Sequence, residues 1–373
     1  MVLSEESALQ LSAVWACARI LTETISTLPI AVYERQGEDR VIARDHTLHY
    51  VLTKHPNPRQ TAVEFRQSQL LNLVLHGNSY ARIERNGIGQ VIALWPLSSE
   101  QVDVKVLNDG SLVYLRNVDG NIEAIAEKNI LHVKLFGNGI VGLSPLGFAR
   151  VSLGVAASSE QYAGKFYANG AKPGGVLTID KVLNKDQRAA IRENFKELTE
   201  GAENAHKLFV LEAGMKYEQV QISPEDAQML QTRRFQLEDI ARFFGVPSFL
   251  INDTEKTTTW GSGIEQMLLG FYTLTLRPYL KLLEDSYNTH LLLPKDQSKF
   301  YVEHNFDALM RADSAGRATF YSTMVQNGLM TRNEARRKEN LSAVPGGDQL
   351  TAQVNLAPLH MLGSRNAAQN PPA

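Results

Sequence analysis

The chain has 373 residues, 43% of them hydrophobic, and a formal net charge of −2. This length exceeds the size at which one hydrophobic core usually suffices, so two or three packed units are expected. The balance of 38 basic against 40 acidic residues argues against a protein held on nucleic acid by a basic face, because such binding depends on neutralising phosphates. The balance still allows a protein through which nucleic acid only passes.

Cys17 is the only cysteine, which excludes an internal disulfide and a thiolate metal cluster. It lies in an apolar run, where a buried small side chain is expected. The acidic first residues do not fit a secretory signal, and charged residues interrupt the apolar stretch 11–32. We therefore expect synthesis in the cytoplasm and no membrane partner.

Two helices and a strand are predicted in the first 77 residues. Apolar residues recur at helical spacing over 7–28, where a proline ends the pattern, and a strand is expected at 30–34. Thr61 and Glu64 have the spacing of a capping box, which opens a second helix that should end at Gly77.

Residues 79–136 have the texture of a β-sheet. Short runs rich in β-branched and aromatic residues lie at 80–84, 91–95, 102–107, 112–115 and 130–136. Three dipeptides typical of tight hairpins separate them: Asn86-Gly87, Asp109-Gly110 and Asp119-Gly120. Antiparallel pairing, and hence an α+β class, is predicted here.

Two long helices are predicted on either side of a small insert. The first covers 144–168 and is rich in small residues, and the second covers 223–244 and ends at Gly245. Between them we expect strands at 176–179, 207–211 and 218–222, with a helix at 184–199.

The last third begins with a polar stretch, 252–263, which has no periodicity and predicts a loop. The elements expected after it are a helix at 264–293 kinked by Pro278, a strand at 301–305, and helices at 313–327 and 331–340.

One motif points to an enzyme. Gly137 to Gly142 match G-x-G-x-x-G after a predicted strand and before a helix, as in dinucleotide-binding folds. The acidic residue expected about twenty positions later, Glu160, falls inside the helix and does not end a strand. A loop joining sheet to helix is the preferred interpretation, and a dinucleotide-dependent oxidoreductase is the first alternative.

Other signs of chemistry are weak. His46 and His49 are three residues apart, yet no third ligand stands at metal-binding spacing. No nucleophile elbow or phosphate-binding loop occurs in the sequence. We therefore expect no catalytic residue, cofactor or metal. A generic scaffold or adaptor protein is the second alternative.

Four segments carry a resemblance to a known family. The longest is R-F-Q-L-E-D-I-A-R-F-F-G-V-P-S-F-L-I-N-D-T-E-K-T-T-T-W-G-S-G at 234–263. The others are S-A-V-W-A-C-A-R-I at 12–20, L-H-G-N-S-Y-A at 75–81 and G-L-M-T-R-N-E-A-R at 328–336. In order and spacing they resemble the portal proteins of long-tailed phages, over nearly the whole chain up to residue 359.

The resemblance implies a division of the chain. Residues 1–144 would form a wing of helices and antiparallel sheet, 145–171 a stem helix, 172–222 an αβ clip, 223–247 a second stem helix, 248–263 a tunnel loop, 264–310 a kinked wing helix with a strand, 311–359 a helical crown, and 360–373 a disordered tail.

The resemblance also implies a role and partners. Portal subunits form a ring, usually of twelve, at one capsid vertex around a channel for double-stranded DNA. The partners implied are the packaging motor (large terminase), a head-completion or adaptor protein, and the major capsid and scaffolding proteins. The chain would be made in the host bacterial cytoplasm and end in the virion, as a structural protein and not an enzyme.

The loop would lie at the narrowest part of the channel. Its candidate residues are Asn252, Asp253, Thr254, Glu255, Lys256, Thr257, Thr258, Thr259 and Trp260. We hypothesise that Lys256 and the threonines contact the DNA backbone transiently, although pairing of Lys256 with Glu255 is an equal alternative. Packing of Trp260 against the next helix is preferred to base stacking, because duplex DNA offers no free base face.

Overall fold

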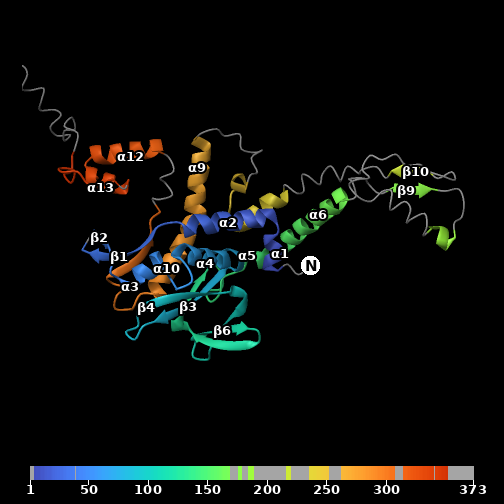
Figure 1. Cartoon of the computed structure of the whole chain (residues 1–373), viewed down its shortest axis with the longest axis horizontal. Helices are drawn as coiled ribbons and strands as arrows, with labels where there is room; N and C mark the ends of the chain where they lie inside the picture. Colours follow the sequence, from blue (N-terminus) through green and yellow to red (C-terminus); the bar gives the residue numbers. More distant parts are fainter. Residues whose placement is uncertain are drawn as a thin grey trace, which may run out of the picture. The chain divides into compact units, whose positions relative to one another are not determined.

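The structure is a computed structural model, and it describes residues 4–37, 39–168, 175–178, 184–188, 216–219, 235–251, 262–306, 314–339 and 341–351. The chain divides into two compact units, residues 1–304 and 305–373. Helices and strands are mixed, as expected (Figure 1). Among the described helices, none is both long and apolar enough to cross a bilayer.

The predicted first helix is two helices, α1 (Glu5–Leu9) and α2 (Ser12–Ser26). Gln10 is the C-cap of α1, and Leu11 has an extended backbone, with φ −73° and ψ 120°, so the helix is interrupted before α2 begins at Ser12. The apolar stripe itself is confirmed, because its members are at most 4% exposed: Leu11, Val14, Ala18, Leu21, Ile25 and Leu28.

Helix α4 (Ala62–His76) packs along α2 and confirms its predicted ends. Thr61 and Glu64 make the reciprocal hydrogen bonds of a capping box, and Gly77 ends the helix at a left-handed φ of 71°. Arg66 on this helix is buried, and its guanidinium donates to the carbonyl oxygens of Ser26 and Leu52 at 2.8 and 2.9 Å. A buried cation thereby joins three helical segments.

A three-stranded sheet joins distant parts of the first unit. Its order is β11-β1-β2, where β1 is Ile30–Gln36, β2 is Asp39–Ile42 and β11 is Phe300–His304. All pairs are antiparallel. The predicted strands β1 and β11 are confirmed, whereas β2 and the following helix α3 (Thr47–Thr53) were not predicted.

Two further antiparallel sheets cover the predicted β-rich region. The first has the order β4-β3-β8 and consists of β3 (Asn78–Arg85), β4 (Val91–Leu97) and β8 (Ile130–Lys134). The second has the order β5-β6-β7 and consists of β5 (Val102–Val106), β6 (Leu112–Val118) and β7 (Asn121–Ala126). All three predicted hairpin turns are found between consecutive strands.

The two sheets share a core of Tyr80, Leu97, Val102, Tyr114, Ile125 and Ile130. On the first sheet, α4 contacts β3 and α3 contacts β4, while α10 (Arg277–His290) contacts β8 (Figure 1). Short 3-10 turns, η1 (Ser99–Gln101) and η2 (Glu127–Asn129), connect strands of the two sheets.

The first long helix is interrupted near its start. It consists of α5 (Pro145–Phe148), capped by Ser144, and α6 (Arg150–Ala168). In the insert that follows, β9 (Gly175–Thr178) pairs antiparallel with β10 (Lys216–Gln219), slightly earlier than the strand expected at 218–222. The strand expected at 207–211 lies outside the described residues, as does most of the helix expected at 184–199.

The kinked helix has a π-helical centre. Helix α9 (Ser262–Phe271) runs into the π-segment η5 (Tyr272–Leu276), and α10 follows with Pro278 in its first turn. A proline has no N–H and its ring clashes with the carbonyl four residues earlier, here in η5, so the irregularity falls on the turn before Pro278.

The described part of the second unit is a helix pair, α12 (Ser314–Gln326) and α13 (Arg332–Lys338). Gly328 takes a φ of 71° after α12, and Thr331 with Glu334 forms the predicted capping box of α13. The amide of Asn333 donates to the carbonyl of Val344 and to Asp348, which holds the following turn against α13. Residues 360–373, expected to be a disordered tail, lie outside the described residues.

Candidate functional site

The candidate loop residues Asn252 to Trp260 lie outside the described residues, so the expected contacts of Lys256 and Trp260 stay predictions. The segments on either side are described. Before the loop stands the 3-10 turn η4 (Ser248–Ile251), and after it α9 begins at Ser262, within the stretch predicted as loop.

The helix that leads to the loop has a well-defined end. Residues 235–244 are helical, and Gly245 follows with φ 65°. The N–H of Val246 donates to the carbonyl of Ala241 and that of Gly245 to Arg242, which is the Schellman pattern. The hydroxyl of Thr275 in η5 donates to the carbonyl of Gly245 at 2.8 Å. This hydrogen bond connects the π-segment to the end of the helix that precedes the candidate loop.

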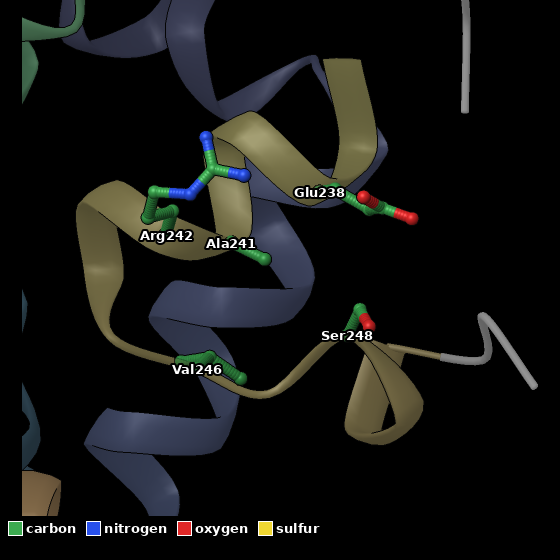
Figure 2. A pocket seen from close by; sticks show the side chains of 5 residues that line it. All are labelled: Glu238, Ala241, Arg242, Val246 and Ser248. Atoms are coloured by element: carbon green, nitrogen blue, oxygen red, sulfur yellow. The ribbon is translucent and has the colours of Figure 1, made fainter. Parts of the chain in front are cut away.

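An open hollow of about 300 Å³ lies at this base, lined by Glu238, Ala241, Arg242, Val246 and Ser248 (Figure 2). Arg242 is also paired with Asp239 at 2.8 Å. The lining residues come from the end of the helix 235–244 and from the turn after it, so the hollow lies beside the segment that leads to the loop.

Backbone N–H groups of the glycine motif at 137–142 are already used in hydrogen bonds within the motif. Gly137 and Gly142 form an antiparallel bridge, and the side-chain oxygen of Asn138 accepts the N–H groups of Ile140 and Val141, both at 2.9 Å. A nucleotide phosphate would need such N–H groups to be available. The strand before the loop, β8, pairs antiparallel with β3, so among the described strands it is not part of a βαβ unit.

Close backbone approach explains the glycines instead. A Cβ on Gly142 would lie 2.1 Å from the carbonyl oxygen of Gly77, and one on Gly137 would lie 2.2 Å from that of Val141. The preferred interpretation, a loop joining sheet to helix, is confirmed, and the structure gives the oxidoreductase alternative no support.

His46 and His49 have structural roles. His46 caps α3 and accepts the N–H of Leu48 at 3.2 Å, while His49 accepts the N–H of Val32 at 3.3 Å. Partial burial lowers the pKa of both imidazoles. Cys17 is fully buried, which raises its thiol pKa to about 12 and leaves it unreactive at neutral pH.

An exposed apolar stripe on α5 and α6 was missed by the sequence analysis. Phe148, Val151 and Val155 are 65, 79 and 50% exposed, and their spacing puts them on one helix face. The opposite side faces the core through Leu153 and Ala156, which are at most 5% exposed. The spacing alone could have revealed the stripe, but apolar residues at this spacing are ordinarily assigned to a core.

Comparison with known proteins identifies the family. The model of the family described as phage portal protein matches residues 12–340. The portal protein of Enterobacteria phage HK97 is 41% identical over 372 residues, covering 99% of this chain and 87% of that protein. The probable portal protein of Streptomyces phage phiC31 is 34% identical, covering 91% of this chain and 76% of that protein.

A solved structure has the same fold. A chain from the neck of a native gene transfer agent (GTA) particle, computed with C12 symmetry, superposes with a TM-score of 0.60 at 21% identity. The superposition covers 92% of this chain and 96% of that one. The family match, the relatives and the fold agree, and the resemblance of the four segments is confirmed: this chain belongs to the phage portal protein family, and it is a non-enzymatic, structural portal subunit.

Proposed function

We propose that copies of this chain close into a ring, of twelve subunits, at one vertex of a phage capsid. The observation that carries the proposal is the match of nearly the whole chain to a chain from a neck computed with C12 symmetry. Symmetric rings arise from one repeated head-to-tail contact between copies, so each subunit must carry two complementary surfaces.

The apolar stripe of α5 and α6 supports such a contact. Phe148 and Val151 are more than half exposed in the single chain, and exposed contiguous apolar side chains mark interaction sites. The helical segment 235–244 could supply the complementary surface. It also exposes apolar side chains, since Phe235 is 62% and Phe243 is 40% exposed. Packing of α6 on that segment of a neighbouring copy would bury both.

The division of the chain follows the family pattern. We assign 1–144 to the wing, 145–171 and 223–247 to the two stem helices, 172–222 to the clip, 248–263 to the tunnel loop, 264–310 to the kinked wing helix and strand, and 311–359 to the crown. Support comes from the described elements: α6 and the helix ending at 244 flank the β9-β10 pair, and η5 interrupts the helix after the loop.

The ring would conduct double-stranded DNA during packaging and ejection. A conduit must let DNA slide, and a chain with net charge −2 and a threonine-rich loop suits weak contact, since strong phosphate neutralisation would slow movement. Through the clip the ring would meet the large terminase and then a head-completion protein, with capsid and scaffolding proteins around it. Its place is the virion, after synthesis in the host cytoplasm.

Deletion of Thr257–Thr259 in the tunnel loop tests the conduit. Purified variant and wild type should form equal numbers of annular particles by negative-stain microscopy, because the deletion leaves the helix end at Gly245 and helix α9 intact. Phage carrying the variant should package or retain less DNA, measured as the fraction of phage heads that are filled with DNA. Normal infectivity of the variant would refute the role of the loop.

Wild-type material that is monomeric or dimeric under all conditions would instead favour a scaffold or adaptor without DNA passage.

A further inference from the structure

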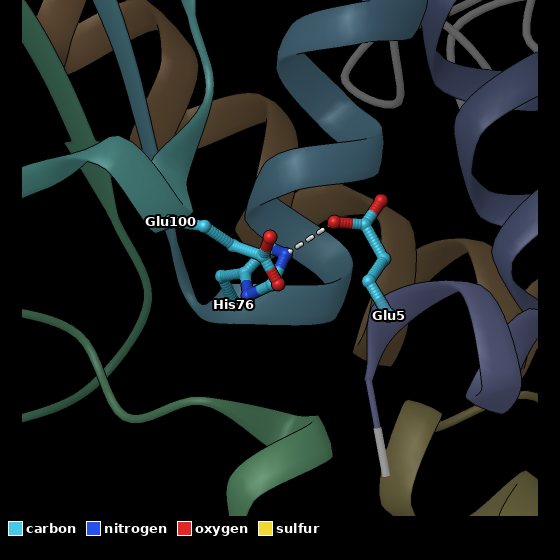
Figure 3. Close-up of side chains that lie close together, drawn as sticks. All are labelled: Glu5, His76 and Glu100. Atoms are coloured by element: carbon cyan, nitrogen blue, oxygen red, sulfur yellow. Dashed lines mark hydrogen bonds and ion pairs between the residues drawn. The ribbon is translucent and has the colours of Figure 1, made fainter. Parts of the chain in front are cut away.

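Three acid–base side chains from distant parts of the sequence converge near the end of α4. Glu5 lies on α1, His76 is the last residue of α4, and Glu100 lies in η1. One potential ligand atom from each lies within 4.8 Å of the other two, and Nε2 of His76 is 2.9 Å from a carboxylate oxygen of Glu5 (Figure 3).

From this geometry we propose a binding site for one divalent metal ion of the Zn²⁺ class, held by Glu5, His76 and Glu100. One imidazole nitrogen with two carboxylate oxygens is a donor set that Zn²⁺ accepts, whereas Mg²⁺ and Ca²⁺ prefer oxygen alone. Three protein ligands leave a fourth position for water.

The charges at this place call for a cation. Carboxylate oxygens of Glu5 and Glu100 lie near the imidazole of His76, at the C-terminus of α4, where the helix carries partial negative charge. Glu5 and His76 are half-buried, at 30 and 17% side-chain exposure, so water screens the repulsion only in part. A divalent ion would neutralise both carboxylates.

Hydrogen bonds of neighbouring residues hold two of the segments that carry the ligands, η1 and α1. In η1, the backbone N–H of Ser99 donates to the side-chain oxygen of Asn72 at 2.9 Å, and the Ser99 hydroxyl donates to the carbonyl of Asn78 at 2.7 Å. These acceptors lie on both sides of His76 in sequence, so the neighbour of Glu100 is fixed against the end of α4. Ser4 caps α1, on which Glu5 lies, by accepting the N–H of Ser7. Such preorganisation lowers the cost of assembling a metal site.

A bound ion would tie α1 to the end of α4 and to η1. Residues 5, 76 and 100 belong to three elements that the chain order keeps apart, which is also why sequence spacing did not reveal them. The sequence led us to expect no metal, and the site departs from that expectation.

Zn²⁺ titration of the tag-free, full-length chain by calorimetry at pH 7.5 tests the site. The key variant is Glu100→Gln, because Glu100 is exposed and its loss should spare the fold. Glu6→Gln is the matched control: Glu6 is an exposed neighbour of Glu5 on α1. We expect wild type and Glu6→Gln to bind one equivalent with equal affinity, and Glu100→Gln to bind at least about tenfold more weakly.

His76→Ala and a second probe complete the experiment. His76→Ala should also lose the Zn²⁺ site, and Co²⁺ added to wild type and to Glu6→Gln should give a visible absorption band that is lost in both ligand variants. Far-UV circular dichroism of all variants checks that they are folded. Equal Zn²⁺ affinity in wild type and Glu100→Gln, or no binding to folded wild type, would overturn the proposal and leave only the hydrogen bond between His76 and Glu5.

Discussion

His132 lies in a buried polar cluster between the sheets β4-β3-β8 and β5-β6-β7. Its Nε2 is 3.0 Å from the side-chain oxygen of Asn78, and its Nδ1 is 3.2 Å from the hydroxyl of Tyr114. The Asn78 oxygen also accepts the N–H of Gly142, so it is an acceptor toward His132 and the proton belongs on Nε2. The ring of Tyr80 lies at 4.5 Å, centroid to centroid.

Burial, with the charge of Lys134 and His290 as smaller causes, lowers the pKa of His132 from 6.5 to about 3. Between these two pKa values, His132 binds a proton in the unfolded state and stays neutral in the folded state. The free energy of unfolding therefore decreases as the pH falls through this range. A change from pH 7.5 to 5 should cost wild type about 2 kcal/mol more than His132→Gln, read from urea unfolding curves.

His55→Gln is the control for this pH dependence, since His55 is exposed. It should lose as much stability as wild type over the same pH range. If His132→Gln and wild type lose the same amount, the buried neutral imidazole is not the group that titrates.

At the scale of elements, the glycine loop connects α4, β3 and β8. The carbonyl of Gly77 accepts the N–H of Leu135 just after β8, and the amide of Asn78 donates to the carbonyl of Gly142 at 2.9 Å. The turn at Gly77 and Asn78, between α4 and β3, is thus hydrogen-bonded to the end of β8 and to the glycine loop that leads to α5. The glycine motif therefore serves this packing contact and does not form the nucleotide site that its pattern suggested.

Gly142→Ala should lower the thermal unfolding midpoint and cost about 1–3 kcal/mol, because its Cβ would overlap the Gly77 carbonyl oxygen and the backbone must move. Gly87→Ala is the matched control in the hairpin of the same sheet, where a Cβ meets nothing within 4 Å. It should stay within about 0.5 kcal/mol of wild type. Equal midpoints for the two variants would contradict the steric explanation.

Elements with strong local patterns were predictable, and elements held by their neighbours were not. The capping box at Thr61 and the left-handed Gly77 fixed both ends of α4. Strand β7 buries only Ile125 and is held by pairing with β6, so it has no apolar alternation to detect. Helix α3 is capped by His46, which is not among the usual capping residues.

For the candidate sites, local patterns were even less informative. The loop at 252–260 could be proposed only through family resemblance, because a polar stretch without periodicity does not state its role. The convergence of Glu5, His76 and Glu100 depends on three chain segments meeting in space. No spacing rule along one segment could have found it.

At the scale of the whole molecule, the proposed ring requires that a surface exposed in one chain be covered by the next copy. The stripe of α5 and α6 is apolar and lies opposite the side of α6 that faces the core. If the stripe of every subunit stayed exposed to water, the subunits would tend to aggregate. In a closed ring, each stripe is covered by the neighbouring subunit.

Charge placed on the stripe should therefore prevent ring closure. In Val151→Asp/Val155→Asp, two carboxylates would be buried without partners at every subunit contact, at a cost of several kcal/mol. We expect annular particles to disappear from negative-stain images and the mass in solution to fall to that of the subunit. Gln161→Asp adds a charge to an exposed position of α6 away from the stripe, so rings should persist. Circular dichroism equal to wild type in both variants makes the comparison valid, and abundant rings in the double variant would remove α6 from the interface.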